Sequence, residues 1–524
     1  MIEKLSGIKL KLGEDERVLV EKAEAALGVK PRYFKILKKS LDARNKKDIY
    51  WTYSIEFSAE KPVKKEPLPV VPNSLVPSDP VIIVGSGPCG LSCAVRLADC
   101  GLKPIVIERG DCVDERVKKT ELFAKLKILD ENSNIQFGEG GAGTFSDGKL
   151  NTQTHSGYNA QVFAEFVRFG APEEIEYLNK PHIGSDKLRG VVKNMRSYVE
   201  SKGGKVLFGT RLTDITIANG EVTNVTVSSG GKEQKIKPYA LVLAIGHSAR
   251  DTFYMLRSRG IIMRQKDFAV GVRVEHLQKD INRAQYGDVC TLLPPADYKI
   301  VSHAGERACF SFCMCPGGFV MPAASEFGGV VVNGMSNYAR DGLNSNSALV
   351  VPVSGCDFGS DDALAGVEFQ RVLERRAFEA GGGDYRAPVQ LVGDFLRGRK
   401  SSAFGSVLPS YPGTRFAEIR DILPDCVCSS LARGIEDADK RLRGFADKYA
   451  VLTAVESRTS SPVRIERGDD LASPSARNLY PGGEGAGYSG GITSSAADGL
   501  RIADRILSYF FEPYFFEKKQ AKNF

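Results

Sequence analysis

The sequence predicts an α/β protein built around a Rossmann-like nucleotide-binding domain. Three observations lead to this prediction. Val81-Ile82-Ile83-Val84 is an uninterrupted apolar run, typical of a parallel strand buried on both faces, and a glycine-rich turn over 85–90 follows it at once. A second apolar run at 104–107 ends in the acidic residue Glu108. A further apolar run that ends at glycine follows at 240–246 and predicts another buried strand.

The composition indicates a folded protein of several domains. The chain has 524 residues, of which 42% are hydrophobic and 26% are charged. Its net charge of +7 comes from dispersed residues, which argues against a nucleic-acid partner and favours a small-molecule substrate. No apolar stretch approaches the roughly 20 residues that span a bilayer, and the first residues lack the apolar core of a signal peptide. The eleven cysteines are scattered as in proteins of a reducing compartment, so we expect a cytoplasmic location. The oligomeric state is left open.

Residues 1–60 are expected to form a small α+β domain of their own. Alternating apolar residues at 8–12, 33–37 and 49–57 predict three strands, and the helical pattern of 14–27 lies between the first two. The resulting βαββ domain contains no residue pattern that indicates a function. A linker over 61–80 follows; it holds six prolines, which favour an extended chain.

The glycine-rich turn has the spacing of a dinucleotide site. Gly85 permits the tight turn, Gly87 lets the backbone approach a pyrophosphate, and Gly90 allows the following helix to pack closely on the strand. The exposed amides at the start of the helix expected over 91–100 stabilise a diphosphate. Glu108 lies eighteen residues after Gly90, near the spacing at which a carboxylate accepts hydrogen bonds from ribose hydroxyls.

The chain beyond this unit does not continue as a nicotinamide dehydrogenase would. Alternating runs at 212–217 and 222–227 flank Asn219-Gly220, a strong signal for a β-hairpin. The pattern G-x-G-x-x-G recurs at 138–143 without a preceding strand, so we interpret it as a cofactor-facing loop. Another glycine-rich segment at 479–492 precedes a helical pattern near the end of the chain.

This order of motifs resembles the glutathione-reductase-like FAD superfamily, in its branch with a discontinuous FAD domain. Longer segments are similar to a narrower family of FAD-dependent dehydrogenases of unassigned substrate. The resemblance covers nearly the whole chain. It is carried by residues 137–150, 244–251, 311–318, 333–336 and the segment around Glu484.

The resemblance implies that FAD binds non-covalently. By this resemblance Glu484 binds the ribitol of FAD, and Gly491 and Ile492 lie near the isoalloxazine. The segment 208–212 lies near the adenine. His247, after the strand-ending Gly246, is expected to contact the residues that bind FAD and to hold them in position. The residues expected to bind FAD are Gly85, Gly87, Pro88, Gly90, Glu108, Arg109, Gly143, Leu212, Gly246, Gly483, Glu484, Gly491 and Ile492.

The same order divides the rest of the chain. The first part of the FAD domain is expected at 81–264 and the second at 446–510. A β-rich substrate domain is inserted at 265–445. The aromatic tail, 511–524, is expected to pack on the FAD domain, with a membrane surface or a second subunit as the alternatives.

Catalytic residues are only weakly indicated. Lys149 is a candidate for stabilising the anionic reduced flavin. His155 is a candidate general acid or base, and the alternative is that it is a polar loop residue without a catalytic role. No Cys-x-x-x-x-Cys pair follows the first FAD segment. For Cys313 and Cys315 a structural role is favoured over a redox or metal role, because no second ligand pair completes a zinc site. No metal is expected. Arg458 either binds an anionic substrate group or forms a salt bridge.

The function predicted from these features is FAD-dependent oxidation or reduction of an unidentified organic substrate, with hydride passing through flavin N5. No second Rossmann motif for NAD(P)H follows, so a pyridine nucleotide is considered only as a transient electron donor. Two alternatives remain at this point. One is a non-redox or RNA-modifying flavoenzyme, and the other is a protein that uses FAD for structure or sensing.

Overall fold

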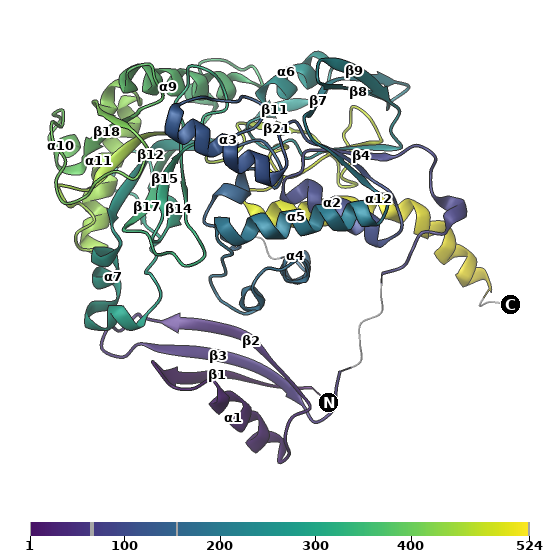
Figure 1. Cartoon of the computed structure of the whole chain (residues 1–524), viewed down its shortest axis with the longest axis horizontal. Coiled ribbons are helices and arrows are strands. Elements are labelled where there is room, and N and C mark those ends of the chain that lie inside the picture. The colour runs from purple at the N-terminus through teal and green to yellow at the C-terminus, as the bar shows by residue number, and fades with distance from the viewer. Residues whose placement is uncertain (1, 63–67, 153–155, 522–524) are drawn as a thin grey trace.

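The computed structural model describes residues 2–62, 68–152 and 156–521, with side chains up to residue 511. Figure 1 shows a small N-terminal sheet with one helix, joined by the linker to a larger body. The body contains a parallel sheet with its helices and a broad, mainly antiparallel sheet. The expected α/β fold is confirmed.

The N-terminal part has the expected order of elements. Its strands pair antiparallel in the order β1-β3-β2, and α1 packs Leu19 and Ala23 against the buried side chains of β3. Alternation along β3 directs Tyr53, Ile55 and Phe57 into this small core. The bounds are β1 Glu3–Lys11, α1 Arg17–Leu27, β2 Tyr33–Asp42 and β3 Tyr50–Ser58.

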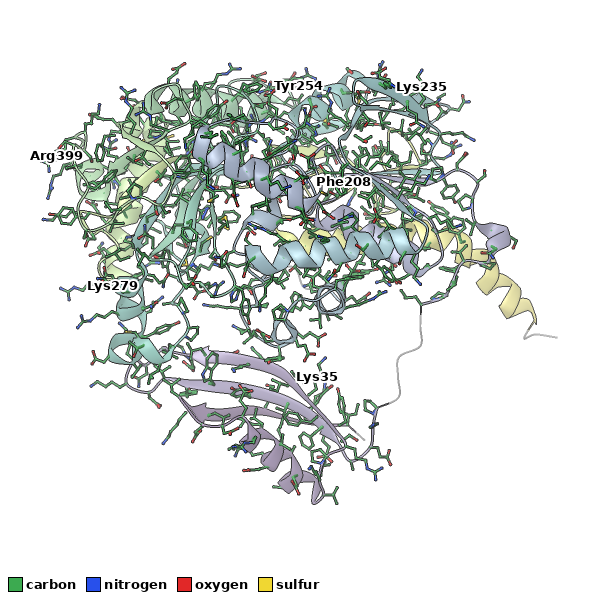
Figure 2. The ribbon with its side chains drawn as sticks, in the orientation of Figure 1. Lys35, Phe208, Lys235, Tyr254, Lys279 and Arg399 are labelled. Carbon is green, nitrogen blue, oxygen red and sulfur yellow. The ribbon has the colours of Figure 1, made fainter. Side chains whose placement is uncertain are left out.

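Strand β2 connects this sheet to the body. The Lys35 side chain extends from the sheet toward the body (Figure 2), and its Nζ lies 2.8 Å from Oε2 of Glu176. The backbone N–H of Lys39 donates to the carbonyl of Tyr177 at 2.8 Å. A strand edge therefore joins the two parts through main-chain hydrogen bonds as well as an ion pair.

The linker is not extended along its whole length. Val71 is buried in the core of the parallel-sheet part, and its N–H donates to the carbonyl of Cys100 at 2.9 Å. A short 3-10 helix follows at Asn73–Leu75. Proline content predicted the interruptions of regular structure here, but an apolar side chain such as Val71 gains from burial wherever the core offers space.

Five parallel strands form the central sheet, in the order β22-β10-β4-β5-β6. Their side chains are buried on both faces in β4 and β10, as the apolar runs predicted. Helix α2 packs against α5 and α12, which lie side by side with it in Figure 1. The bounds are β4 Val81–Val84, α2 Pro88–Asp99, β5 Ile105–Ile107, α5 Ser185–Ser201, β6 Lys205–Leu207, β10 Ala240–Leu243, β22 Leu479–Pro481 and α12 Ile492–Ala521.

A three-stranded antiparallel sheet lies beside the parallel one. The hairpin expected around Asn219-Gly220 is present, and both turn residues have positive φ angles, 53° and 72°. This backbone is the one that Asn-Gly favours in a two-residue hairpin turn. The bounds are β7 Thr210–Ala218, β8 Glu221–Ser229 and β9 Lys232–Ile236.

The large sheet has seven strands in the order β13-β14-β17-β12-β20-β18-β19. Along β12, Val270, Val272 and Val274 face the apolar core, so Arg273 points to the opposite face. Helices α9 and α11 pack against the sheet. The bounds are β12 Phe268–Leu277, β13 Val301–Ser302, β14 Cys309–Cys315, β17 Asn344–Val353, β18 Ala387–Leu391, β19 Thr414–Phe416 and β20 Val451–Glu456.

Two of these elements cross the boundaries expected from the sequence. Strand β20 lies after residue 445, yet it pairs with β12 and β18 in the large sheet. Helix α12 continues past residue 510 into the segment 511–524 that was expected to be a separate tail, and its Phe510 packs against Tyr239. The boundary at residue 445 depends on which strands β20 pairs with, and these lie far away in the chain. The apolar run of β20 does not indicate its partner strands. The side chains of the tail beyond 511 lie outside the described residues.

Short elements complete the body. The strand pairs β11–β21 and β15–β16 form two further two-stranded sheets. No helix among the described residues is long and apolar enough to cross a membrane. The remaining bounds are α3 Val113–Leu126, α4 Tyr158–Arg168, α6 Arg250–Ser258, β11 Met263–Gln265, α7 Gln278–Tyr286, β15 Phe319–Pro322, β16 Val332–Met335, α8 Gly355–Phe358, α9 Ala365–Gly381, α10 Val392–Leu396, α11 Asp425–Arg441 and β21 Val463–Ile465.

Candidate functional site

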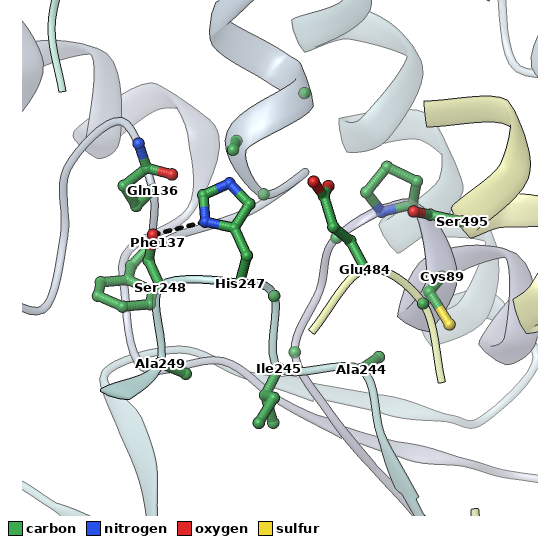
Figure 3. A pocket seen from close by; sticks show the side chains of 18 of the residues that line it. Cys89, Gln136, Phe137, Ala244, Ile245, His247, Ser248, Ala249, Glu484 and Ser495 are labelled. Atoms are coloured by element: carbon green, nitrogen blue, oxygen red, sulfur yellow. Dashed lines mark hydrogen bonds between the residues drawn. The ribbon is translucent and has the colours of Figure 1, made fainter. Parts of the chain in front are cut away.

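A cavity of about 350 Å³ lies at the carboxyl ends of the parallel strands. This is the edge at which open α/β sheets bind ligands. Figure 3 shows His247 and Glu484 projecting into the same space from different loops. The sequence-predicted residues that line the cavity are Gly85, Gly87, Pro88, Glu108, Arg109, Gly143, Lys149, Leu212, Gly246, Gly483, Glu484, Gly491 and Ile492.

Gly90 is the one described member of the predicted cofactor set that does not line the cavity, because it is a packing residue. A Cβ atom at Gly90 would lie 1.9 Å from the carbonyl oxygen of Gly85. Gly85 has a φ of +103°, and its own Cβ would lie 2.2 Å from the carbonyl oxygen of Ala244. The turn is therefore pressed between helix α2 and strand β10. Only glycine at these two positions lets the start of α2 reach the cavity.

The second glycine-rich loop, 138–143, packs against the first. The N–H of Gly140 donates to the carbonyl of Ser86 at 2.9 Å, and a Cβ at Gly141 would lie 3.1 Å from Cα of Gly87. Gly143 in turn faces Ile492 at the start of α12, whose Cγ1 would be 2.9 Å from an added Cβ. Loops from three distant parts of the chain thus form one cradle of backbone amides. Such a cradle fits an extended dinucleotide.

Glu108 braces these loops. One carboxylate oxygen accepts from the N–H and the Oγ of Ser86, at 2.9 and 2.7 Å. The other accepts from the N–H groups of Gly110 and Gly138, at 2.9 and 3.0 Å. The sequence predicted that this carboxylate accepts from ribose hydroxyls. In the structure, the roughly four acceptor positions of this carboxylate are used by its four hydrogen bonds to Ser86, Gly110 and Gly138.

Arg109 forms a flat part of the wall next to Glu108. Its Nη2 donates to Oδ1 of Asp251 at 2.8 Å and to Oγ1 of Thr252 at 3.1 Å. The guanidinium lies 4.4 Å from the centre of the Phe137 ring. These contacts hold the guanidinium plane against the cavity, where it can stack on a planar group.

Two ionisable residues near the strand ends have strongly shifted pKa values. Burial raises the pKa of Glu484 to about 7, against the opposing charge of Lys266. Burial lowers the pKa of His247 to about 3, and its ring Nδ1 lies 2.8 Å from Oγ of Ser248. His247 is therefore a neutral hydrogen-bonding group. Glu484 changes charge near neutral pH.

The large sheet, together with strand β16, contributes the opposite wall of the cavity. The sequence did not indicate Glu456 as a site residue, although a glutamate at the end of the apolar run 451–455 was a local signal. Its Oε2 lies 3.2 Å from Nη1 of Arg273, and burial raises its pKa to about 7 despite that guanidinium. The residues from this side are Phe312, Cys313, Asn333, Glu456, Arg458 and Thr459.

Behind this wall lies a buried ionic network. Arg458 and Arg250 each place a guanidinium nitrogen 2.8 Å from the carboxylate of Glu374. Arg458 also donates to Oγ of Ser248 at 3.1 Å, which connects the network to the loop that holds His247. Of the two roles considered for Arg458, the structure shows the salt bridge. The network joins α6 to α9 and so holds the two walls together.

The two catalytic candidates have different outcomes. Lys149 lines the cavity, and its Nζ donates to the carbonyl oxygen of Met314. Asp147 in the same loop accepts from Nε of Arg340 at 3.0 Å. His155 lies outside the described residues. No group of three or more His, Cys, Asp and Glu side chains that could hold a metal ion occurs within 2–62, 68–152 and 156–521.

Family models match three segments of the chain. Residues 79–261 match the pyridine nucleotide-disulphide oxidoreductases, and residues 267–459 match the C-terminal-domain-like model of FAD-dependent proteins. Residues 1–58 match a domain of unknown function. The second match includes β20, which is the last strand of the large sheet in chain order.

Solved structures show only a weak likeness. A flavin-dependent brominase has a TM-score of 0.38 at 11% identity, with 82% of this chain and 78% of that chain covered. A geranylgeranyl bacteriochlorophyll reductase-like protein from Thermoplasma acidophilum has a TM-score of 0.35 at 12% identity, with 84% and 82% covered. Scores of this size support no conclusion about substrate.

A protein of Clostridium beijerinckii, described only as uncharacterized, is 44% identical over 533 residues, which covers 97% of this chain and 99% of that protein. Such identity over the full length shows common family membership. The two larger family models and the glycine cradle agree on FAD as the cofactor. The chain therefore belongs, with the protein of Clostridium beijerinckii, to one family of FAD-dependent oxidoreductases.

Proposed function

We propose that this enzyme transfers hydride between an organic substrate and N5 of FAD, with the substrate bound against the wall that the large sheet contributes. The observation that carries the proposal is the unlike character of the two walls. Glycine loops with free space for a cofactor form one wall, and polar and aromatic side chains of β14, β16 and β20 form the other. A cofactor on the first wall presents its reactive face to the second.

The proposed cofactor site follows the cradle. Gly85, Gly87 and Pro88 at the start of α2 bind the diphosphate, because the helix N-terminus carries partial positive charge. Leu212 and Arg109 lie at the adenosine end. The remaining contacts, toward the ribitol and the flavin ring, are Gly143, Gly246, Gly483, Glu484, Gly491 and Ile492.

Glu456 is the proposed proton carrier. FAD supplies the two-electron chemistry when it is bound, and the protein must deliver or accept the accompanying proton. Glu456 lines the cavity, is 4% exposed, and has a pKa raised to about 7 by burial. A carboxyl with such a pKa exists in both protonation states near neutral pH. The hydrogen bond from Arg273 orients it.

The electron donor in this proposal is a pyridine nucleotide that binds transiently. The match of residues 79–261 to pyridine nucleotide-disulphide oxidoreductases motivates this choice. The experiment is an anaerobic visible spectrum of the purified protein, before and after addition of NADH or NADPH. We expect either NADH or NADPH to bleach the flavin absorbance within the mixing time. A flavin that stays oxidised with both would rule out this donor, and a failure to bind added FAD would overturn the cofactor site itself.

A further inference from the structure

Strand β14 loses its regular pairing with β17 next to the cavity. Phe312 is paired with Ala348, but the next pair is Cys315 with Asn346. Two residues of β14 therefore oppose a single residue of β17, which is a β-bulge. At the bulge Cys313 has a φ of +43°, in the left-handed region that a non-glycine residue adopts only at a cost. Bulges of this kind redirect side chains beside active sites.

The bulge brings two thiols together. Cys313 is half-buried and lines the cavity, whereas Cys315 is fully buried behind it. Sγ of Cys315 lies 3.4 Å from the carbonyl oxygen of Cys313, so the buried thiol lies against the residue that carries the other thiol. Two extended residues span at most about 7 Å, and a bulge shortens this span toward the Cα separation of a disulfide.

The surroundings of the pair suit a sulfur that carries negative charge. Arg273 is fully buried, and its Nη2 donates to the carbonyl of Cys313 at 2.5 Å and lies 4.0 Å from Sγ of Cys315. The hydrogen bond from Cys315 lowers the pKa of Cys313, burial opposes this, and the charges of Arg273 and Lys149 add to it. The thiol that faces the cavity is thus the more acidic of the two.

Asn346 is an independent observation at the same place. It is fully buried opposite Cys315, and neither its amide nitrogen nor its amide oxygen has a hydrogen-bond partner within the described part of the chain. A Cβ at Gly334 would lie 2.3 Å from this amide oxygen and 2.5 Å from Nη2 of Arg273. The amide therefore lies beside the guanidinium that contacts the thiols. An unpartnered buried amide is costly unless a change of state gives it a partner.

We propose that Cys313 and Cys315 form a reversible disulfide that exchanges an electron pair with the FAD, so that the enzyme carries a second two-electron redox centre. The inference rests on the proposed position of the flavin between Gly491 and this wall. In one direction the S–S bond breaks as the disulfide accepts two electrons and two protons from reduced FAD, which leaves two thiols and oxidised FAD. In the other direction the two thiols reduce FAD and the S–S bond forms.

Cys89 provides the contrast within the same cavity. It also lines the wall, but burial and the charge of Asp498 raise the pKa of its thiol well above the ordinary value. Its sequence neighbour Cys93 is fully buried in α2, and burial raises that pKa as well. These two thiols are packing residues of helix α2. They have neither the bulge nor the guanidinium of the Cys313–Cys315 pair.

The first measurement identifies the disulfide itself. The purified protein is equilibrated with glutathione buffers of graded potential, alkylated, digested and analysed by mass spectrometry. We expect Cys313 and Cys315 to lose reactivity together under oxidising buffers and to regain it with dithiothreitol. Exposed Cys356 is the internal control for intramolecular bonding. The proposal is overturned if Cys313 and Cys315 are both alkylated, or both carry glutathione, at every potential. This measurement does not require bound FAD, so it stands even if the proposed cofactor site fails.

The second measurement identifies exchange with the flavin. The oxidised holoprotein is titrated anaerobically with dithionite, and the electron pairs taken up per FAD are counted. We expect two pairs in the native protein and in Cys356→Ser, and one pair in Cys315→Ser. Cys313→Ala, at the half-buried position, is the second variant in case Cys315→Ser does not fold. Equal uptake by the native protein and either pair variant would overturn the exchange.

Discussion

Nη2 of Arg458 lies 2.8 Å from Oε2 of Glu374, and both side chains are almost fully buried. Glu374 also lies 2.8 Å from Arg250, so one carboxylate pairs with two guanidinium groups, and Glu326 is a second partner of Arg250. The two arginines keep the pKa of Glu374 well below its ordinary value, although burial alone would raise it. This carboxylate connects the FAD-binding loops to the large sheet.

We predict that Glu374→Gln lowers the free energy of unfolding by about 3–5 kcal/mol, because it removes the carboxylate partner of the buried Arg458 and leaves Arg250 with Glu326 alone. The measurement is chemical unfolding of the FAD-loaded protein. The control is Lys193→Gln, which removes a surface ion pair with Asp114 at 2.7 Å. Exposed pairs contribute about 0–1 kcal/mol, so a similar loss in both variants would contradict the role of the network.

Acid should unfold the protein through the same carboxylate. Since the folded pKa of Glu374 is depressed, its stabilising contribution is fully present above its ordinary pKa of 4.5 and is lost as the pH falls through the folded value. We predict that the stability difference between the native protein and Glu374→Gln shrinks below pH about 4. A difference that stays constant from neutral pH to acid pH would argue against this linkage.

Gly90 and Gly190 are a matched pair of helical glycines. An added Cβ at Gly90 would collide with the carbonyl oxygen of Gly85 at 1.9 Å, whereas an added Cβ at Gly190 in α5 meets nothing within 4 Å. We predict that Gly90→Ala purifies with little bound FAD and regains little on addition of FAD. Gly190→Ala should keep full FAD content and gain up to about 1 kcal/mol, the helix propensity difference between alanine and glycine. Normal FAD content in Gly90→Ala would refute the packing argument.

The buried carboxyl of Glu456 predicts a second pH effect of opposite sign. Its folded pKa of about 7 lies above the ordinary value of 4.5, so the folded protein binds the additional proton between these values. The stability contribution is therefore lost as the pH rises from about 4.5 to about 7, by on the order of 3 kcal/mol. Melting temperatures of the native protein and Glu456→Gln across this range measure it. Parallel curves would show that Glu456 is already ionised. The pKa of Glu484 is raised as well, so the same measurement on Glu484→Gln gives the contribution of that carboxyl separately.

Lys149 is proposed to lie near the reduced flavin, whose negative charge a lysine stabilises. We predict that Lys149→Met lowers the flavin midpoint potential by on the order of 30 mV, the equivalent of about 1.4 kcal/mol for a two-electron couple. Redox titration against dyes of known potential measures the shift. Lys279→Met, at an exposed position of α7 shown in Figure 2, should leave the potential unchanged. An unchanged potential in Lys149→Met would remove the lysine from this role.

Local signals in the sequence were sufficient for the cofactor side of the molecule. The apolar run 81–84, the glycines after it and the Asn219-Gly220 turn each specify a local conformation through short-range sterics and hydrogen bonds. The structure has them as predicted. Lys149 and the glycines of the late segment also line the cavity, because a glycine-rich loop beside a buried strand lets backbone come close to a bound cofactor. The expected boundary at 445 was displaced by β20, whose pairing with β12 no local pattern indicates.

The sequence by itself determined the α/β class, the strand, glycine turn and helix that begin the dinucleotide cradle, and the Asn219-Gly220 hairpin. Only the tertiary structure decided what faces that cradle. Glu456, Cys313 and Arg458 reach the cavity because β14 and β20 belong to one sheet, although well over 100 residues separate them. One of the four hydrogen bonds to Glu108 likewise comes from Gly138, in a loop 30 residues away. Pairing between distant segments is set by the global packing of apolar surface, which has no period or spacing in the sequence.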